Sequence, residues 1–439
     1  MEKRSLSTAH VVWLTLGSLV GAGLVTVTGS AAATTGYSVW LAFGVATVLG
    51  FLAVIPYFFA AGTVVLSGGM YTTNALFGNP VLGGLTMINC LPGALGNAVV
   101  PIGLSIYLRA IFPNIPALPI SVGAVLIFYV LNLLGINALA QVQKYMMYLL
   151  LAGLFIFSVF GFKNFNPEAV NFSGAEFMTA GIGGFAVATN MLSMSTQSYF
   201  NALAFSKYTK NPKKNVLKAM LICLPLLIVI YVGVTMAAVG AVDLETFAGH
   251  SMADVAKIIM PTPVFFCFTI LCPVMALATT LNGNMSNFTI MLTTAAEDGW
   301  FPKAVTKKNR FGSAYIITTV VALFILIPAA LNLSVSFITN NLMLFTNLVG
   351  LVPFYSLWRM PKKFPELWSK SAAHISPVVF NVIMGIGLVA RVALISFAMI
   401  SLTPVNLAIN LVVAALLVGF CIWRVKSGKV SMKTDYEEE

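Results

Sequence analysis

The chain has 439 residues, of which 59% are hydrophobic and 8% charged, and its formal net charge is +11. A water-soluble domain of this length could not bury so much apolar surface, so the composition excludes a soluble protein and indicates a chain surrounded mostly by lipid. No Asp, Glu, Lys or Arg lies between Arg4 and Arg109. Because one transmembrane helix needs about 20 apolar residues, this run alone is long enough for three spans. It is also too long for a cleaved signal peptide.

Prolines, charges and Gly/Asn turns divide the rest of the chain in the same way, and twelve transmembrane segments are predicted. They lie at residues 11–35, 38–66, 80–108, 118–136, 141–162, 177–205, 216–242, 262–290, 314–331, 335–358, 376–401 and 404–424. Residues 1–10 and 425–439 are the predicted N-terminal and C-terminal tails. The predicted fold class is therefore an all-α polytopic membrane protein.

The positions of the charged residues predict the orientation. Loops on the side of both termini carry all but four of the Lys and Arg residues, so we expect both termini to be cytoplasmic and the protein to cross the cell membrane many times. One of the four, Arg391, lies inside the eleventh span, where we expect its side chain to extend toward the membrane surface or a loop. No Asp or Glu lies within any predicted span, so no carboxylate is present there to bind a cationic side chain or relay a proton.

Several function classes are excluded by missing patterns. The five cysteines have no metal-ligand spacing, the three histidines lie far apart, and the sequence has no P-loop and no nucleophile–base pair. We therefore expect neither an enzyme nor an enzymatic cofactor. Basic cytoplasmic loops account for the net charge, so no nucleic-acid partner is expected.

Two predicted spans carry residues that weaken a helix. Residues 16–30 read LGSLVGAGLVTVTGS, with four glycines in the middle of the first span. Small residues permit close packing of helices in lipid, but they are also typical of a discontinuous helix whose free backbone groups bind a substrate. The sixth span contains the polar run NMLSMSTQSYFN at 190–201. Spans one and six are five apart, as in two inverted five-helix repeats that each begin with a broken helix. The predicted repeats are 11–162 and 177–358, followed by helices eleven and twelve in 376–424.

Four motifs in chain order support this interpretation. The first span contains Gly17-Ser18-Leu19-Val20-Gly21-Ala22-Gly23, and the second is followed by Ser67-Gly68-Gly69-Met70-Tyr71. The loop after the sixth span reads KNPKKNVLKA at 210–219, and Asn282 in the eighth span precedes DGWFP at 298–302. With these motifs the chain resembles the amino acid–polyamine–organocation (APC) permease superfamily. The resemblance covers nearly the whole chain and implies the leucine-transporter fold: twelve helices, with a 5 + 5 inverted repeat, discontinuous helices 1 and 6, and two additional helices.

The resemblance also implies a substrate site at the two breaks. The substrate carboxylate would bind the N–H groups of Ala22 and Gly23, at the positive end of a half-helix. Its ammonium group would bind carbonyls of Leu19, Ser193 and Met194, and the Thr196 hydroxyl would complete the site. The chain departs from the family at Thr196, where many members carry an aromatic gate, at Lys207-Tyr208, where many carry an acidic pair, and at Ile290, where they carry an arginine. Asn89, Asn97, Gln197 and Asn282 are further candidates for the pocket.

The same resemblance bears on the coupling ion. Relatives that are proton-coupled or exchange substrates often carry a lysine in span five, and alignment places Leu150 at that position. Sodium-coupled relatives use two carbonyls of span one with an Ala-x-x-Thr-Thr set in span eight. The corresponding residues here are Gly17, Val20, Ala276, Thr279 and Thr280, five oxygen ligands suited to a hard cation. The alternative is that Thr279 and Thr280 only pack or bond within their own helix.

The predicted function is a secondary active transporter that imports a neutral amino acid by alternating access, coupled to sodium. Two alternatives stay open: a sodium-independent exchanger or uniporter of amino acids or amines, and a membrane sensor that binds an amino acid without moving it.

Overall fold

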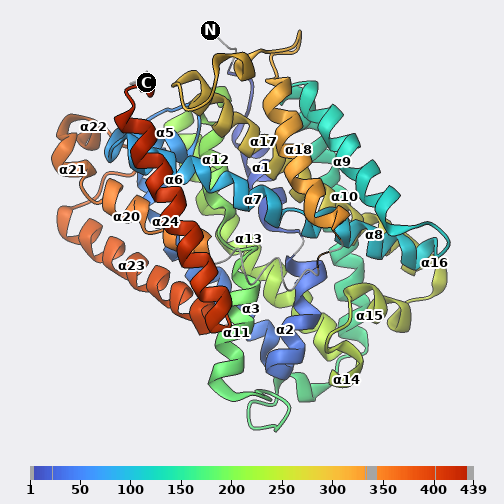
Figure 1. The fold of residues 1–439 in the computed structure, drawn as a ribbon. Coiled ribbons are helices and arrows are strands. Elements are labelled where there is room, and N and C mark those ends of the chain that lie inside the picture. Colours follow the sequence, from blue (N-terminus) through green and yellow to red (C-terminus); the bar gives the residue numbers. More distant parts are fainter. Residues whose placement is uncertain (1–3, 22, 332, 334–343, 401, 433–439) are drawn as a thin grey trace.

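The computed structural model describes residues 4–21, 23–331, 333, 344–400 and 402–432. In this part of the chain the structure is helical and has no β-strand. Both chain ends lie at the same end of the helix bundle (Figure 1). At that end Leu6 pairs with the loop after the sixth predicted span, since the Leu6 N–H bonds to Tyr208 O at 2.9 Å and Lys210 N–H bonds to Leu6 O at 2.9 Å.

The first half of the chain forms the following helices. They are α1 (Thr8–Leu19), the π-helical turn η1 (Gly23–Val27), α2 (Thr28–Thr35), α3 (Val39–Ala53), α4 (Ile55–Thr63), α5 (Met70–Phe77), α6 (Pro80–Ile88), α7 (Cys90–Gly96), α8 (Val99–Ile111), α9 (Ala117–Leu133) and α10 (Ile136–Lys163). Predicted spans two and three are thus interrupted. Pro56 lies in the first turn of α4, and residues 80–96 contain two prolines and four glycines, which weaken a helix interior.

The second half of the chain is also helical. Its helices are α11 (Gly181–Ser193), the 3₁₀ turn η4 (Ser198–Phe200), α12 (Asn201–Ala204), α13 (Pro212–Gly240), α14 (Leu244–Phe247), α15 (Met252–Ile259), α16 (Thr262–Thr269), the π-helical turn η6 (Ile270–Val274), α17 (Met275–Glu297), α18 (Tyr315–Ala330), α20 (Val352–Leu357), α21 (Met360–Lys363), α22 (Pro365–Ser369), α23 (Pro377–Ile400) and α24 (Pro404–Lys426). The tenth predicted span begins outside the described residues.

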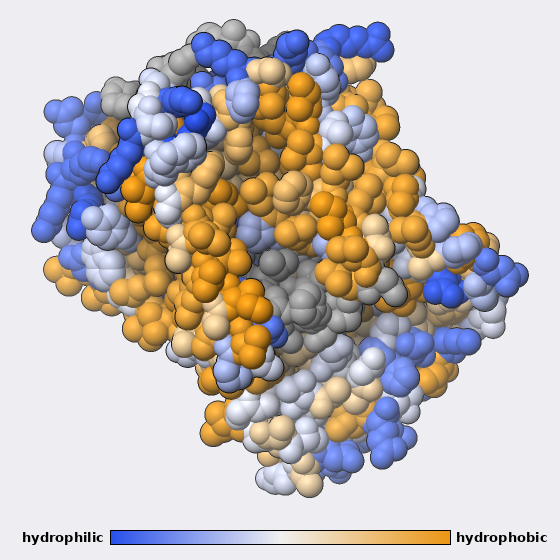
Figure 2. All heavy atoms as spheres, in the orientation of Figure 1, coloured by the Kyte–Doolittle hydropathy of each residue, from blue (hydrophilic) through white to orange (hydrophobic). Residues whose placement is uncertain are grey.

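The exterior of the bundle suits a lipid environment. Among the described residues, seven helical runs are long and apolar enough to cross a membrane, and α9 and α18 are shorter apolar helices. On the face shown in Figure 2, hydrophobic residues cover the middle of the molecule and hydrophilic residues gather toward its two ends. The predicted all-helical polytopic membrane protein is confirmed, while the count of twelve spans and the inverted repeat stay predictions.

The helices that carry the two predicted breaks lie at the centre of the bundle. Helix α1 packs against α10, α13 and α17, and α11 packs against α2, α3 and α23. Eight of the twelve residues of α1 are buried, including its four C-terminal residues. Among the described residues, those predicted for the site in spans one, six and eight are buried, except Met194, which is partly buried. They lie in the protein interior and not on the lipid-facing surface.

Candidate substrate and ion site

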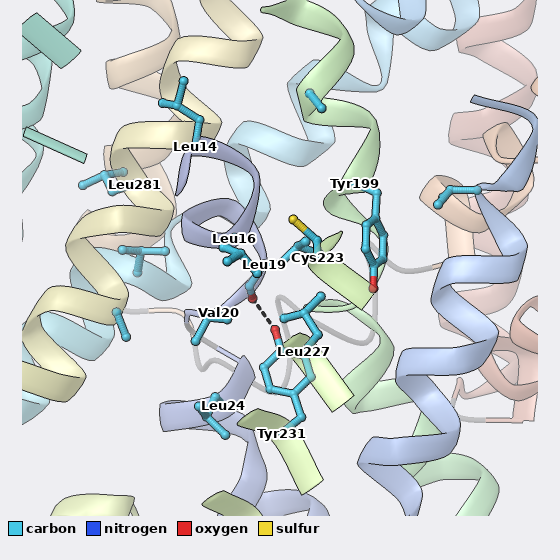
Figure 3. Packing of buried hydrophobic residues seen from close by; sticks show 14 of the residues in the cluster. Leu14, Leu16, Leu19, Val20, Leu24, Tyr199, Cys223, Leu227, Tyr231 and Leu281 are labelled. Carbon is cyan, nitrogen blue, oxygen red and sulfur yellow. Dashed lines mark hydrogen bonds between the residues drawn. The ribbon is translucent and has the colours of Figure 1, made fainter. Parts of the chain in front are cut away.

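The first predicted span is interrupted near its centre. Helix α1 ends at Leu19, Val20 adopts an extended backbone conformation, and helical structure resumes with η1 at Gly23. We call residues 20–22 the first break; Ala22, a predicted carboxylate-binding residue, lies outside the described residues. The Leu19 carbonyl accepts a hydrogen bond from the Tyr231 hydroxyl of α13 at 2.5 Å (Figure 3). The break therefore directs a backbone carbonyl of α1 toward a side chain of another helix.

The sixth predicted span is interrupted as well. Helix α11 ends at Ser193 and a 3₁₀ turn begins at Ser198, so we call residues 194–197 the second break. The Tyr231 hydroxyl also lies 3.0 Å from the carbonyl oxygen of Ser195. A phenolic hydroxyl carries one proton, so the carbonyls of Leu19 and Ser195 share a single donor. Both carbonyls thus keep the capacity to accept a further hydrogen bond.

A cavity of ≈ 130 Å³ lies beside both breaks. On this measure one water molecule needs about 10–15 Å³, so a small solute has room to enter. The lining comes from several parts of the chain. They are α1 (Ser18 and Leu19), the second break and the residues after it (Met194, Ser195, Ser198, Phe200 and Asn201), α17 (Thr280, Asn284, Phe288 and Met291), the 89–100 segment, Met70 and Thr346. None of these lining residues carries a charge.

The cavity lies on the side of the breaks that faces the chain termini. Its α1 residues precede the first break, and Ser198 and Asn201 follow the second. The chain after α12 returns to the N-terminus, because Tyr208 and Lys210 bond to Leu6. If the termini are cytoplasmic, as the positive charges predict, this arrangement is an inward-facing cavity.

Three asparagines form a chain of hydrogen bonds across one wall of the cavity. The Asn201 Nδ2 group donates to Asn284 Oδ1 at 3.0 Å, and Asn284 Nδ2 donates to Asn97 Oδ1 at 2.9 Å. Asn97 was predicted from the sequence as a pocket residue, whereas Asn201 and Asn284 were not. Asn284 follows Thr280 by four residues and therefore shares its face of α17. That spacing was the available signal for this residue.

The predicted substrate residues separate into two groups. Leu19 and Met194 line the cavity, whereas Gly23, Ser193 and Thr196 are not among its lining residues. The Ser193 carbonyl already accepts a hydrogen bond from the Thr196 hydroxyl at 3.1 Å. That hydroxyl also bonds to Ala46 O of α3 at 2.9 Å, so Thr196 holds the second break against α3.

Four of the five predicted ion residues, Gly17, Ala276, Thr279 and Thr280, come together between α1 and α17. The Thr280 hydroxyl lies 3.2 Å from Gly17 O and 3.0 Å from Ala276 O, and the Thr279 hydroxyl lies 2.9 Å from Ala276 O. Both threonines thus bond within their own helix, and Thr280 also bonds across to α1. Val20 follows Leu19 and caps α1 through its N–H bond to Leu16 O. Neutral carbonyl and hydroxyl oxygens of this kind suit a sodium ion.

Glycine permits this close approach of α1 to its neighbours. A Cβ atom on Gly21 would lie 1.6 Å from the Thr280 hydroxyl oxygen, and one on Gly17 would lie 1.7 Å from Nε2 of Gln143. The glycine-rich segment therefore combines close packing with a discontinuity of the helix, and its role in substrate binding stays a prediction. Gly17 and Gly21 allow close helix packing, and the same segment contains the break.

Arg391 does not extend to the membrane surface, and that expectation was wrong. Only 3% of the residue is exposed, and its guanidinium bonds to Gln197 of the second break at 2.6 Å. Helix α23 is packed against α3 and α11, which places this side chain inside the bundle.

The comparisons with known proteins agree with this architecture. Residues 6–425 match the family described as amino acid permease. An uncharacterized protein of Methanocaldococcus jannaschii is 22% identical over 342 residues, which cover 74% of this chain and 77% of that protein. A branched-chain amino acid permease of Bacillus subtilis is 25% identical over 272 residues, which cover 56% of this chain and 57% of the permease. The chain is therefore a multi-pass membrane transporter, not an enzyme, and it belongs to the amino acid permease family of the APC superfamily.

Proposed function

We propose that this permease imports a neutral amino acid by alternating access and couples the import to sodium. The observation that carries the proposal is the cavity beside the two breaks. It has no charged lining residue, and its lining includes Leu19 and Ser195, whose backbone carbonyls bond to Tyr231 and not within a helix. An amino acid with a neutral side chain has no net charge, so such a site can balance its two charged ends with backbone dipoles alone.

The two ends of the amino acid would bind different parts of the breaks. The ammonium group is a donor of three hydrogen bonds, and the carbonyls of Leu19 and Ser195, which share one proton of Tyr231, are acceptors with spare capacity. The carboxylate would bind the N–H groups at the start of η1, near Gly23, where a helix N-terminus favours negative charge. The side chain would then extend into the cavity.

The part of the cavity that would receive the side chain of the substrate favours an aliphatic group. Met194, Phe200, Phe288 and Met291 supply apolar lining, and apolar contact is the main source of affinity for such a group. One relative is a branched-chain amino acid permease. We therefore propose leucine, isoleucine and valine as the first substrates to test.

Sodium would bind between α1 and α17. The oxygens of Gly17, Ala276, Thr279 and Thr280 lie in one connected group, and α1 and α17 belong to the two different predicted repeats. An ion at this position would tie the first repeat to the second and stabilise one of the two access states. Because the coupling is reciprocal, the substrate must raise the sodium affinity by the same factor.

Import also requires the side opposite the cavity to open. On that side, Gly249 N–H bonds to Gly29 O of α2 at 2.8 Å. A Cβ atom on Gly29 would lie 1.8 Å from the His250 carbonyl oxygen, so this loop lies directly on α2. We propose that this contact separates when the substrate enters from outside.

The test is uptake of radiolabelled leucine, isoleucine or valine into proteoliposomes, with an inward sodium gradient or with choline at the same pH. Uptake that needs the sodium gradient is the expected result. Uptake in choline only after the vesicles are preloaded with amino acid would identify an exchanger and contradict sodium coupling. Binding without flux in either buffer would identify a sensor and contradict transport.

A further inference from the structure

Arg391 connects α23 to three other parts of the bundle. Its Nη1 group donates to Gln197 Oε1 at 2.6 Å and to Asn347 Oδ1 at 2.9 Å, and its Nη2 group donates to the backbone carbonyl of Ala53 at 2.8 Å. Gln197 belongs to the second break, Asn347 to the helical stretch 344–349, and Ala53 to the end of α3. The guanidinium therefore lies where these segments meet.

The charge of this guanidinium has no counter-ion. All three of its acceptors are neutral, and Arg391 takes part in no ion pair among the described residues. The sequence leaves little room for one, because no Asp or Glu lies between Asp298 and Glu366 or between Glu366 and Asp435. Arginine stays protonated in proteins. A buried, unpaired charge at membrane depth is costly and is typical of a functional position.

One of the two side chains that bind Arg391 could have supplied a counter-ion without a change of shape, because aspartate has nearly the shape of Asn347. Gln197 could not, because its Nε2 group is itself a donor, to Asn347 Oδ1 at 3.3 Å and to Ser193 O at 3.4 Å. The Nδ2 group of Asn347 and the Nε group of Arg391 are both buried without a hydrogen-bond partner, so an aspartate at 347 would replace an unpartnered donor with a second acceptor. Stability alone would favour that carboxylate. The amides instead preserve a net positive charge.

This charge lies directly behind the wall of the cavity. Two residues close to Gln197 in sequence line the cavity: Ser195, two positions before it, and Ser198, directly after it. Asn347 follows Thr346, which also lines the cavity. Arg391 itself is not a lining residue. It can therefore act on a bound molecule through its electric field and not by contact.

We propose that Arg391 is a specificity-determining residue that excludes amino acids and amines with a cationic side chain. This inference rests on the proposed function, in which the cavity receives the substrate side chain. Two like charges about 10 Å apart, at an effective dielectric constant of about 20, weaken binding by about tenfold or more. A neutral side chain does not experience this repulsion. The α-ammonium and α-carboxylate groups experience the field in leucine and lysine alike, so the ratio of the two affinities isolates the effect of the side-chain charge.

The test adds a carboxylate and leaves the arginine in place. Asn347→Asp would pair with Arg391 and cancel its charge. Competition of unlabelled leucine and lysine against labelled leucine is measured for the wild type, Asn347→Asp, Arg391→Met and Arg391→Lys. We expect the lysine-to-leucine affinity ratio to rise about tenfold in Asn347→Asp and in Arg391→Met, and to stay at the wild-type value in Arg391→Lys, which keeps the charge.

The outcomes separate this inference from the proposed function. An unchanged ratio in an Asn347→Asp variant that binds leucine normally would overturn the inference and leave neutral amino acid transport intact. Loss of leucine binding in Asn347→Asp would also overturn it, since the charge would then serve the fold. A wild-type protein that binds none of the neutral amino acids would contradict the proposed function itself. Thermal unfolding of each variant shows which of them are folded, and we expect Asn347→Asp to be at least as stable as the wild type.

Discussion

Gly23, the first residue of η1, lies directly against Ser195 of the second break. A Cβ atom on Gly23 would lie 1.8 Å from the Ser195 hydroxyl oxygen and 2.6 Å from its Cβ atom. Real Cβ atoms essentially never approach other atoms this closely. The missing side chain at position 23 is therefore what allows η1 and the second break to meet.

Replacement of Gly23 by valine should abolish substrate binding. The added atoms would force η1 and the second break apart, and overpacking of this kind costs about 1–3 kcal/mol in a well-packed core. Binding of labelled leucine to purified protein measures the effect. Gly233→Val in α13 is the matched control, because a Cβ atom there has no neighbour within 4 Å.

A second, compensating substitution at Ser195 distinguishes a local steric clash from general misfolding. Without a side chain at 195, the nearest atom to a Cβ on residue 23 would be the residue 195 Cα at 3.8 Å, an ordinary contact. We expect Gly23→Ala to lose binding and the double variant Gly23→Ala/Ser195→Gly to regain it. Wild-type affinity in Gly23→Val would mean that the first span is only a packing helix.

The sequence predicted the breaks because their cause is local. Glycine loses more conformational freedom in a helix than any other residue, and four glycines in 16–30 or a polar run in an apolar helix can be recognised without a partner. The ion residues were implied by the family resemblance, which matched the Ala-x-x-Thr-Thr pattern of sodium-coupled relatives to α17. The sequence thus indicated the membrane fold, both weak points and the face of α17 that meets α1.

Contacts between distant segments could not be predicted in this way. Tyr231 is one of several aromatic residues in apolar spans, and nothing in its neighbours indicates that its hydroxyl meets carbonyls of both breaks. Arg391 was expected to reach the membrane surface because an arginine in a span usually does so. Its burial depends on acceptors supplied by α3, the second break and residue 347, which only the tertiary packing brings together.

Replacement of Thr280 by alanine should weaken sodium binding more than it changes substrate selectivity. The variant removes the one hydroxyl that bonds to both Gly17 O and Ala276 O, and with it a ligand of the proposed ion. The sodium concentration that gives half-maximal uptake should rise severalfold. Thr293→Ala is the matched control, because the Thr293 hydroxyl bonds only to Thr289 O of the same helix. Equal sodium dependence in the two variants would contradict the proposed ion site.

Replacement of Leu150 by lysine should reduce the dependence of uptake on sodium. Leu150 is fully buried in α10 and lies two turns from Gln143, on the same face. Gln143 in turn lies beside Gly17. A lysine ammonium on that face would bring a tethered cation toward the first break. Leu149→Lys is the control, since Leu149 is an exposed neighbour. An equal loss of uptake in both variants, with no change in sodium dependence, would count against this role.

Replacement of Tyr231 by phenylalanine should destabilise the substrate-free protein more than the substrate-bound protein. The ring can keep its stacking on Phe43, whose centroid lies 4.1 Å away, so the change removes only the hydroxyl. The carbonyls of Leu19 and Ser195 then lose their shared donor, and leaving a buried acceptor unsatisfied costs about 1–3 kcal/mol. A bound amino acid would supply new donors from its ammonium group. Its stabilising effect on thermal unfolding should therefore be larger in Tyr231→Phe than in the wild type.

The matched control for this prediction is Tyr199→Phe. Tyr199 is equally buried, and its hydroxyl has no hydrogen-bond partner in the described structure, so loss of that hydroxyl should change the unfolding temperature little. The measurement is thermal unfolding of the three proteins with and without saturating leucine. If Tyr231→Phe were no less stable than Tyr199→Phe, the hydroxyl would not connect the two breaks. If it were less stable but leucine gave no extra stabilisation, the freed carbonyls would not bind the ammonium group, and the substrate site would have to lie elsewhere in the cavity.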